Sequence, residues 1–255
     1  MSLLKIGVIG CGHMGNYHIN VLSLIDNIDL VGVYDIDPQK TNQAANKYGV
    51  KAFGDLNAFI KSIDCAVVAT PTVTHYDIAK KLLDFNKHIL IEKPITESVA
   101  QAEELIDLAV SKNLVLHVGH LERFNGAVAE LRNNIIHNPY LIEARRLSPK
   151  NYRIKDVGVI LDIMIHDIDI VLSLAGNQKV SKIAASGFKV YSDFEDVAVA
   201  IIEFENGCIA DLKASRVTDE KIRTLAVSQE NSYIFLDYST QDIQIHRQPS
   251  SEYFV

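Results

Sequence analysis

A glycine-rich turn near the N-terminus constrains the fold of this chain more than any other feature. The apolar, β-branched stretch 3–9 predicts a buried strand, and Gly10, Gly12 and Gly15 follow it in a G-x-G-x-x-G pattern. The apolar spacing over 17–25 then predicts a helix. The first glycine permits a tight turn, the second lets a pyrophosphate approach the backbone, and the third lets helix and strand pack closely. Unpaired N–H groups and the helix dipole attract phosphate to the start of such a helix.

An acidic residue follows the glycines at the spacing that a dinucleotide requires. A second predicted strand, residues 30–34, ends at Asp35, about 20 residues after the last glycine. A carboxylate there accepts the hydroxyl groups of an adenosine ribose and repels a 2′-phosphate. An unrelated surface aspartate beside a glycine-rich turn would explain this order of elements less well. We therefore predict that the chain binds NAD, with Asp35 on the ribose and the glycine turn on the pyrophosphate: Gly10, Gly12, His13, Met14 and Gly15.

Composition excludes several classes of protein. The 255 residues are enough for one large domain or two ordinary ones. A formal net charge of −7 without a run of Lys or Arg argues against a nucleic-acid surface. Three widely spaced cysteines without a C-x-x-C pattern predict inert buried thiols. Lys5 and the glycines interrupt the N-terminal apolar run, so we expect no signal peptide or membrane span. These features are typical of a cytoplasmic enzyme.

The first half of the sequence alternates between predicted strands and helices. The predicted strands are 3–9, 30–34, 65–69, 88–91 and 114–118, with a weaker one at 50–53. The predicted helices are 15–24, 38–48, 56–62, 75–85 and 98–112. Apolar strands separated by helices imply a parallel sheet covered on both faces. We therefore expect an α/β class protein whose residues 1–119 form a doubly wound, NAD-binding Rossmann domain.

The pattern changes after Gly119. A predicted helix, a strand and a long apolar helix come first, at 125–136, 140–147 and 157–174. Strands without intervening helices follow at 180–190, 197–204, 208–216, 222–228, 233–236 and 243–246. This order predicts that residues 120–255 form an α+β domain with a largely antiparallel open sheet, for substrate binding and oligomerisation. A sheet face without helices favours a homodimer or homotetramer.

Two predicted strand ends carry candidate site residues. In an open parallel sheet the ligand lies beyond the carboxyl ends of the strands. Thr70 and Pro71 follow one such end, and Glu92, Lys93 and Pro94 follow another. The Lys93 ammonium could there reach a substrate oxygen, although most loop lysines are simply solvated. Pro94 could also fix a cis turn. We expect Thr70, Pro71, Glu92 and Lys93 to contribute to the cofactor site.

The long apolar helix carries a narrow polar stripe. Its members fall at i, i+4, i+7 and i+11: Asp162, His166, Asp169 and Ser173. At about 100° per residue they share one side of the helix, and Asp167 points away. Such a stripe faces a crevice, a partner or an internal network, or is the wet face of a half-buried helix. A carboxylate one turn from an imidazole can orient the ring and raise its basicity, which suits a general base.

Metal binding is a competing use of Asp162 and His166. Zinc usually needs a third protein ligand at suitable spacing. His117 and His120 lie elsewhere in the sequence and have no cysteine partners. We therefore rank metal binding below acid–base chemistry and predict no metal site.

Four motifs together resemble those of one enzyme family. They are Gly10-x-Gly12-x-x-Gly15, Thr70-Pro71, Glu92-Lys93-Pro94 and the run from Gly158 to Asp167. The resemblance is to the glucose–fructose oxidoreductase, inositol dehydrogenase and MocA family, and it covers both predicted domains. It implies NAD(P)-dependent oxidation of a secondary alcohol on a sugar or cyclitol. It also implies that His166 is the base, that Lys93 holds the hydroxyl and that Asp162 supports both.

Within that family, the stretches 119–125, 143–149 and 161–176 look most like bacterial UDP-N-acetylglucosamine 3-dehydrogenases. A UDP-sugar needs cations for its pyrophosphate, and arginine forks match phosphate geometry. The candidate substrate-binding residues are therefore Asp162 and His166 with three arginines (Arg123, Arg145 and Arg146), and Arg153 lies nearby in the sequence. Ordinary surface arginines are the alternative.

Other functions remain open at this point. One is the oxidation of inositol, a free sugar or a dihydrodiol, and another is an NAD-binding regulatory protein without turnover. The retention of Lys93, Asp162 and His166 argues against the second. Related enzymes usually continue for several tens of residues beyond the point that corresponds to Val255, so we expect the second domain to be incomplete at its C-terminal end.

Overall fold

The computed structural model describes residues 3–150, 157–176 and 178–247. The chain divides into two compact units, Met1–Gly119 and His120–Val255. Each unit has its own sheet and its own apolar core. Arg153 lies outside the described residues.

The N-terminal unit is a six-stranded parallel sheet in the order β3-β2-β1-β4-β5-β6. Its strands are β1 (Leu4–Ile9), β2 (Ile28–Tyr34), β3 (Lys51–Ala52), β4 (Cys65–Val68), β5 (His88–Ile91) and β6 (Leu116–Val118). Its helices are α1 (His13–Leu22), α2 (Pro38–Tyr48), α3 (Leu56–Ser62), η1 (Thr72–Thr74), α4 (His75–Asp84) and α5 (Val99–Ser111). This strand order is that of a Rossmann domain, whose ligand site lies where the order reverses, between β1 and β4.

Three of the six helices described in this unit begin at a residue whose side chain caps them. The Asp37 carboxylate accepts from the Gln39 N–H, Asp55 caps α3, and Ser98 caps α5. Such caps satisfy N–H groups that have no partner within the helix. Helices α1, η1 and α4 have no such cap; at α1, Gly12 stands at the N-cap position and provides no side chain.

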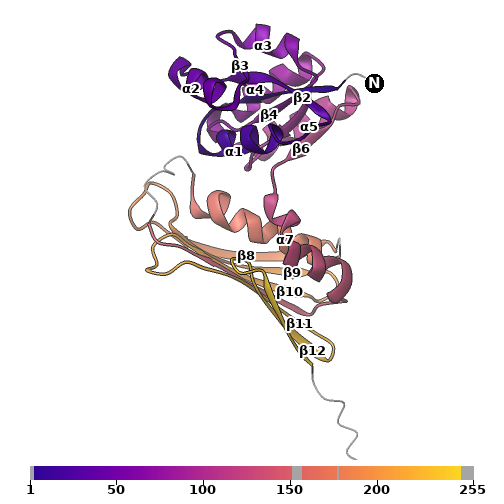
Figure 1. Ribbon diagram of the computed structural model, residues 1–255. Helices are drawn as coiled ribbons and strands as arrows, with labels where there is room; N and C mark the ends of the chain where they lie inside the picture. The colour runs from indigo at the N-terminus through magenta and orange to yellow at the C-terminus, as the bar shows by residue number, and fades with distance from the viewer. Residues whose placement is uncertain (1–2, 151–156, 177, 248–255) are drawn as a thin grey trace, which may run out of the picture. The chain divides into compact units, whose positions relative to one another are not determined.

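The C-terminal unit is a seven-stranded mixed sheet with helices on one face (Figure 1). Its strands are β7 (Leu141–Leu147), β8 (Val180–Phe188), β9 (Val197–Phe204), β10 (Ile209–Ser215), β11 (Ile222–Gln229), β12 (Ser232–Asp237) and β13 (Asp242–Arg247). Its helical segments are η2 (Leu121–Phe124), α6 (Gly126–Glu130), η3 (Leu131–Ile135), η4 (Ile160–Met164) and α7 (Ile165–Leu174). The order is β13-β12-β11-β7-β10-β9-β8, and all pairs except β7–β10 are antiparallel.

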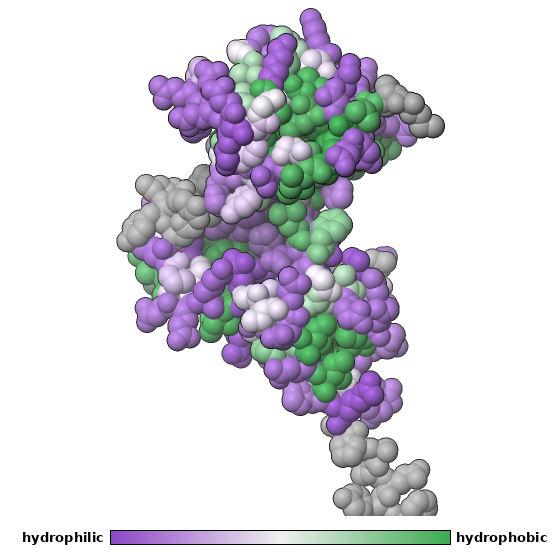
Figure 2. Space-filling model, in the orientation of Figure 1, coloured by the Kyte–Doolittle hydropathy of each residue, from purple (hydrophilic) through white to green (hydrophobic). Residues whose placement is uncertain are grey.

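Side chains alternate between the two faces of this sheet. On β7, Ile142, Ala144 and Arg146 are buried, whereas Arg145 is exposed. The first three share the face that carries α7, and Arg145 lies on the other face because strand side chains alternate. That other face includes the half-exposed apolar residues Val199, Ile201, Ile209 and Tyr233. The surface of both units mixes hydrophilic and hydrophobic areas (Figure 2).

The long helices predicted in this unit are not regular. The helix predicted over 125–136 is α6 followed by the π-helical η3, and the helix predicted over 157–174 opens with the π-helical η4. The hydrophobic spacing predicted the helices but not their π turns, because a π turn adds a residue without changing the apolar character. π turns are frequent at functional sites.

Candidate active site

The glycine turn after β1 is shaped by two close backbone approaches. Gly10 has φ +94°, a left-handed conformation that favours glycine, and an added Cβ would overlap the Ala69 backbone. A Cβ on Gly15 would overlap the Gly10 carbonyl. These two glycines are therefore required by the packing of α1 against β1 and β4.

Gly12 is different, because a Cβ there would meet nothing within 4 Å. No packing contact therefore requires this glycine, and open space lies beside its backbone. No side chain caps the N-terminus of α1. Free N–H groups and the positive end of the helix dipole therefore fit a pyrophosphate group at this turn.

The Asp35 carboxylate is held at the end of β2 beside the glycine turn. It accepts from the Cys11 N–H at 2.7 Å and from the Asp37 N–H at 2.9 Å. Each oxygen keeps a lone pair for a ribose hydroxyl. The next residue, Ile36, is 90% exposed and offers an apolar surface beside that carboxylate. The geometry at this strand end therefore fits an adenosine.

The pKa of the thiol within the glycine turn lies well above its usual value. Burial first, and then the nearby Asp35 carboxylate, raise the pKa of Cys11 to about 12. Burial also raises the pKa of Cys65 and of Cys208. All three cysteines are free; Cys11 and Cys208 are buried as predicted, whereas Cys65 is only half-buried.

The loops after β4 and β5 are joined by His75. Its ring is only 1% exposed and lies 2.9 Å from the Thr70 carbonyl oxygen and 2.8 Å from that of Pro94. The Lys93–Pro94 peptide bond is cis, as predicted, and the Lys93 side chain is half-buried. His75 thereby fixes the strand end that presents Lys93. The sequence placed His75 at a helix start but gave no sign of this bridge.

Glu92 contacts helix α1, which follows the glycine turn. Its buried carboxylate lies 2.7 Å from Nε2 of His18, a residue of α1. A Cβ on Gly119 would come within 3.2 Å of the same carboxylate. This contact gives Glu92 a position against α1, whereas Thr70 is half-buried and Pro71 exposed at the neighbouring strand end.

In the C-terminal unit, the candidate acid–base pair lies at the start of the long helix. Asp162 belongs to η4 and is 9% exposed, and His166 is half-buried in the first turn of α7. Nη1 of Arg216 lies 3.8 Å from Oδ2 of Asp162. The sequence did not single out Arg216, because a residue 54 positions from Asp162 shares no local pattern with it.

The three candidate arginines have three different environments. Arg146 is 2% exposed and donates to the carboxylates of Asp167 and Glu122 at 2.8–3.1 Å. Because its guanidinium already forms internal ion pairs with these carboxylates, we do not retain Arg146 as a pyrophosphate ligand. Arg145 lies on the sheet face opposite to α7, so we do not retain it beside His166.

Arg123 remains a candidate. Its side chain is 46% exposed and binds both carboxylate oxygens of Asp169, with one of these hydrogen bonds at 2.7 Å. Part of the polar stripe on α7 is therefore an internal ion pair, while Arg123 keeps an exposed edge. The Asp169 carboxylate also lies 3.9 Å from Nδ1 of His120.

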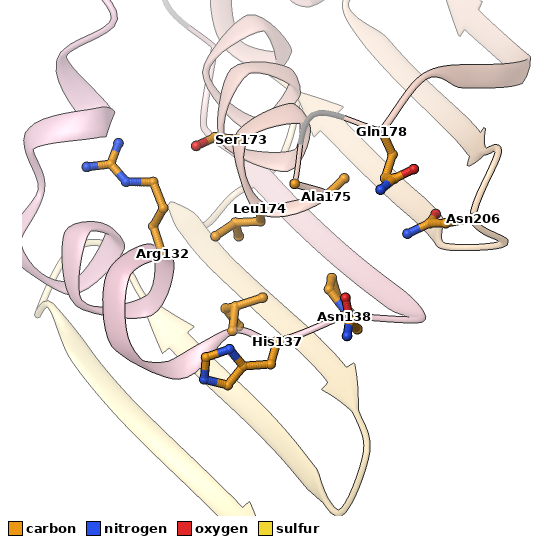
Figure 3. Close-up of a pocket in the computed structure, with 11 residues that line it drawn as sticks. Arg132, His137, Asn138, Ser173, Leu174, Ala175, Gln178 and Asn206 are labelled. Atoms are coloured by element: carbon orange, nitrogen blue, oxygen red, sulfur yellow. The ribbon is translucent and has the colours of Figure 1, made fainter.

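A cavity of about 290 Å³ lies at the other end of α7 (Figure 3). Its lining includes Arg132 and His137 together with Ser173, the last member of the predicted polar stripe. From His166 to Leu174 the helix rises about 12 Å. The stripe therefore does not form one site. Among the residues that the structure describes, no three His, Cys, Asp or Glu side chains gather as metal ligands would.

These features define the class of the protein. A Rossmann sheet with an uncapped, glycine-lined helix start and a carboxylate at the end of the second strand is typical of a dinucleotide-binding domain, here followed by an α+β unit. Residues 4–120 match the model of the "Oxidoreductase family, NAD-binding Rossmann fold", and residues 125–234 match the "GFO/IDH/MocA C-terminal domain". The chain belongs to this GFO/IDH/MocA family of NAD-dependent oxidoreductases.

Individual relatives are similar over most of both units. The chain is 34% identical over 246 residues to UDP-N-acetylglucosamine 3-dehydrogenase of Acidithiobacillus ferrooxidans, covering 96% of this chain and 78% of the relative. A solved structure of that enzyme superposes with a TM-score of 0.92 at 33% identity, covering 97% of this chain and 81% of the other. Myo-inositol 2-dehydrogenase of Thermotoga maritima is 27% identical over 231 residues, with coverages of 84% and 69%.

The fold class, the family and the NAD cofactor predicted from the sequence are thereby confirmed. In the described ranges, no helix combines the length and apolar character needed to cross a bilayer. The roles of Lys93, Asp162 and His166 stay predictions.

Proposed function

We propose that this chain oxidises the C3 hydroxyl of UDP-N-acetylglucosamine to the 3-keto sugar with NAD. The observation that carries this proposal is the 34% identity to a UDP-N-acetylglucosamine 3-dehydrogenase over 96% of the chain. The retained Lys93, Asp162 and His166 support turnover rather than binding alone.

The chain's own residues then have distinct chemical tasks. His166 accepts the hydroxyl proton as a general base, and Asp162 supports it from the preceding turn. The Lys93 ammonium stabilises the negative charge that develops on the substrate oxygen. When bound, NAD accepts the hydride from the carbon that carries this hydroxyl.

Three features of the first unit would hold the cofactor. The N–H groups around Gly12, His13 and Met14 face its pyrophosphate, because no side chain caps α1. Asp35 accepts from the adenosine ribose. Thr70, Pro71 and Glu92 lie at the neighbouring strand ends.

Arg123 is the candidate ligand for the UDP pyrophosphate. It lies on the helix face of the second unit, and its ion pair with Asp169 of α7 fixes the guanidinium while 46% of the side chain stays exposed. A fixed planar fork loses little entropy when it binds a phosphate oxygen.

The test is NADH formation with a panel of alcohols: UDP-N-acetylglucosamine, free N-acetylglucosamine, glucose and myo-inositol. We expect turnover with the UDP-sugar. His166→Asn and Lys93→Ala should each lower kcat by roughly 10²–10⁴-fold, the range of a general base or an oxyanion stabiliser. NAD affinity, measured by calorimetry, should change little, because neither residue holds the pyrophosphate or the ribose. Full activity of either variant would refute its role.

Inositol oxidation is the second candidate. It rests on the 27% identity to a myo-inositol 2-dehydrogenase. Turnover of myo-inositol without turnover of any UDP-sugar would replace the first proposal and leave the family unchanged. NAD binding without turnover of any alcohol would favour a regulatory protein.

We also propose that the chain forms a homo-oligomer through the sheet face opposite to α7. On this face Lys213 of β10 lies opposite Arg145 of β7, and together they form a positively charged row. Asp211 and Glu143 lie opposite each other in the next row of the same face, which is negatively charged. Two adjacent rows of opposite charge are self-complementary under a two-fold rotation. Ile201→Lys should therefore lower the molar mass measured by light scattering, and an unchanged mass would contradict this interface.

We also propose that the protein is located in the cytoplasm. The three cysteines are all free, and reduced thiols are usual in the cytosol.

A further inference from the structure

Arg216 is buried at the end of β10 and holds two separate segments, one at Val157 and one at residues 192–196. It is 2% exposed. Its Nε donates to Asp196 at 2.9 Å, its Nη1 to the Val157 carbonyl at 3.0 Å, and its Nη2 to the Ser192 hydroxyl at 3.1 Å. A planar guanidinium with several donors in use fixes the relative positions of its partners. One of those partners, Val157, immediately precedes the segment that carries Asp162.

The two residues before β9 complete this support. Asp196 is fully buried and accepts from three consecutive N–H groups, the Ser192 hydroxyl and Arg216. Glu195 accepts from the Val159 N–H through its carbonyl at 2.8 Å and from the Ile160 N–H through its carboxylate at 3.2 Å. A carboxylate at a helix N-terminus is favourable to the helix dipole. The start of η4 is thus capped by a residue distant in sequence.

A glycine makes this cap possible. An added Cβ on Gly158 would overlap the Glu195 carboxylate. Gly158 belongs to the same short run of residues as Asp162 and His166. A glycine is needed there to leave room for the Glu195 side chain, and not because of the backbone conformation. The packing therefore links the family motif to the turn before β9.

Arg216 also faces Asp162 directly. The 3.8 Å between Nη1 and Oδ2 is too long for a hydrogen bond but short enough for an ion pair. Asp162 is 9% exposed, so solvent screens this attraction only weakly. The same guanidinium therefore holds the backbone before Asp162 and attracts its carboxylate.

We propose that Arg216 is a positioning residue for Asp162, and this inference rests on the proposed function of the Asp162–His166 pair. It acts through Asp162 and touches no substrate. Arg216→Met should lower kcat by about 10²-fold, the effect of a displacement near 1 Å at a reacting group. KM should change by less than about threefold, because ground-state binding is not removed. Arg216→Lys keeps the charge without the fork and should recover part of the loss.

Arg146 provides a matched control. It is equally buried, at 2% exposure, and pairs with Asp167 behind the same helix. Arg146→Met should lower the melting temperature by an amount similar to Arg216→Met, with kcat within about threefold of the wild type. A purely structural role of Arg216 predicts the same result for both variants.

A double-mutant cycle separates the roles further. When Asp162→Asn is already present, adding Arg216→Met should lower kcat by a further factor of less than about three. The reason is that Asp162, through which Arg216 acts, is already changed. Fully multiplicative effects, or equal kcat losses in the Arg216 and Arg146 variants, would overturn the proposal. If Arg216→Met does not fold, Arg216→Lys and Arg146→Lys are compared in the same way.

Amide hydrogen exchange supplies a readout that does not depend on turnover. Exchange at residues 158–162 should be faster in Arg216→Lys than in Arg146→Lys, and equal exchange in both would also count against the proposal. If the wild type oxidises none of the alcohols tested, the proposed function fails while this comparison still decides whether Arg216 holds the segment.

Discussion

Alanine at Gly12 and at Gly15 should separate the two roles of the glycine turn. A methyl group on Gly12 meets nothing within 4 Å, and the φ of −72° suits any residue. A methyl group on Gly15 overlaps the Gly10 carbonyl, which is backbone and cannot turn aside. We therefore predict that Gly12→Ala folds normally and loses NAD affinity, whereas Gly15→Ala loses both stability and affinity.

The magnitudes follow from these surroundings. At Gly12, an N-cap position, alanine is a poorer cap but reduces the entropy of the unfolded chain, so the net change stays within about 0.5 kcal/mol. At Gly15, overpacking costs about 1–3 kcal/mol, or at least about 4 °C in melting temperature for a domain of this size. The Gly12 methyl group occupies the space through which the pyrophosphate approaches. We expect a Kd for NAD at least about tenfold higher, or 1.4 kcal/mol.

Thermal unfolding with and without NAD, together with titration calorimetry, measures both effects. Ligand at about 100 times its Kd stabilises the wild type by about 2.7 kcal/mol, and a tenfold weaker Kd halves that gain. Wild-type NAD affinity in Gly12→Ala would show that the pyrophosphate does not approach this backbone. An unchanged melting temperature in Gly15→Ala would show that α1 is not packed on the turn as described.

Asp35→Ala should weaken NAD binding and narrow the preference for NAD over NADP, which we expect to be at least about tenfold in calorimetry of the wild type; equal affinities in the wild type would contradict the ribose contact. Arg123→Gln should raise KM for UDP-N-acetylglucosamine more than it lowers kcat. Arg145→Gln is its control. A raised KM in Arg145→Gln but not in Arg123→Gln would indicate that the UDP-sugar binds on the other sheet face. Burial alone would raise the pKa of Asp196, but the N–H groups of Tyr191 and Val190, Arg216 and the Ser192 hydroxyl outweigh it and hold that pKa well below its usual range. Its stabilising contribution is therefore complete above about pH 4, the unfolded pKa, and is lost as the pH falls below it. In urea unfolding, Asp196→Asn should be less stable at neutral pH and lose less stability on acidification; equal acid slopes would refute this.

Much of the fold follows from local sequence. The predicted bounds 38–48, 56–62, 88–91 and 197–204 agree with α2, α3, β5 and β9. Each of these elements has a local end signal, such as Asp37 before Pro38 or the Asn206-Gly207 turn after β9. Apolar periodicity and end signals are short-range, so they can be recognised in the sequence without knowledge of the tertiary structure.

The site was predicted less completely, because the deciding contacts are long-range. Arg145 and Arg146 are adjacent and chemically identical, yet one is exposed and the other is 2% exposed. A shift of one residue in the register of β7 would exchange their faces. The strand was visible in the sequence, but its buried face was not, since Arg146 breaks the apolar alternation by pairing with Asp167.

The buried side chains of Arg146 and Arg216 suggest why the segment η4–α7 is held by charged groups. A buried ion pair is often no more stabilising than well-packed apolar side chains, because both ions lose their hydration. Apolar packing is tolerant of small shifts, however, whereas a guanidinium with donors on Asp196, Val157 and Ser192 allows only a narrow range of positions. In the proposed function Asp162 supports the general base His166, and a displacement of about 1 Å near the reacting groups lowers the rate. In the proposed function, the charged partners therefore serve position more than stability, at the segment that begins one turn before Asp162.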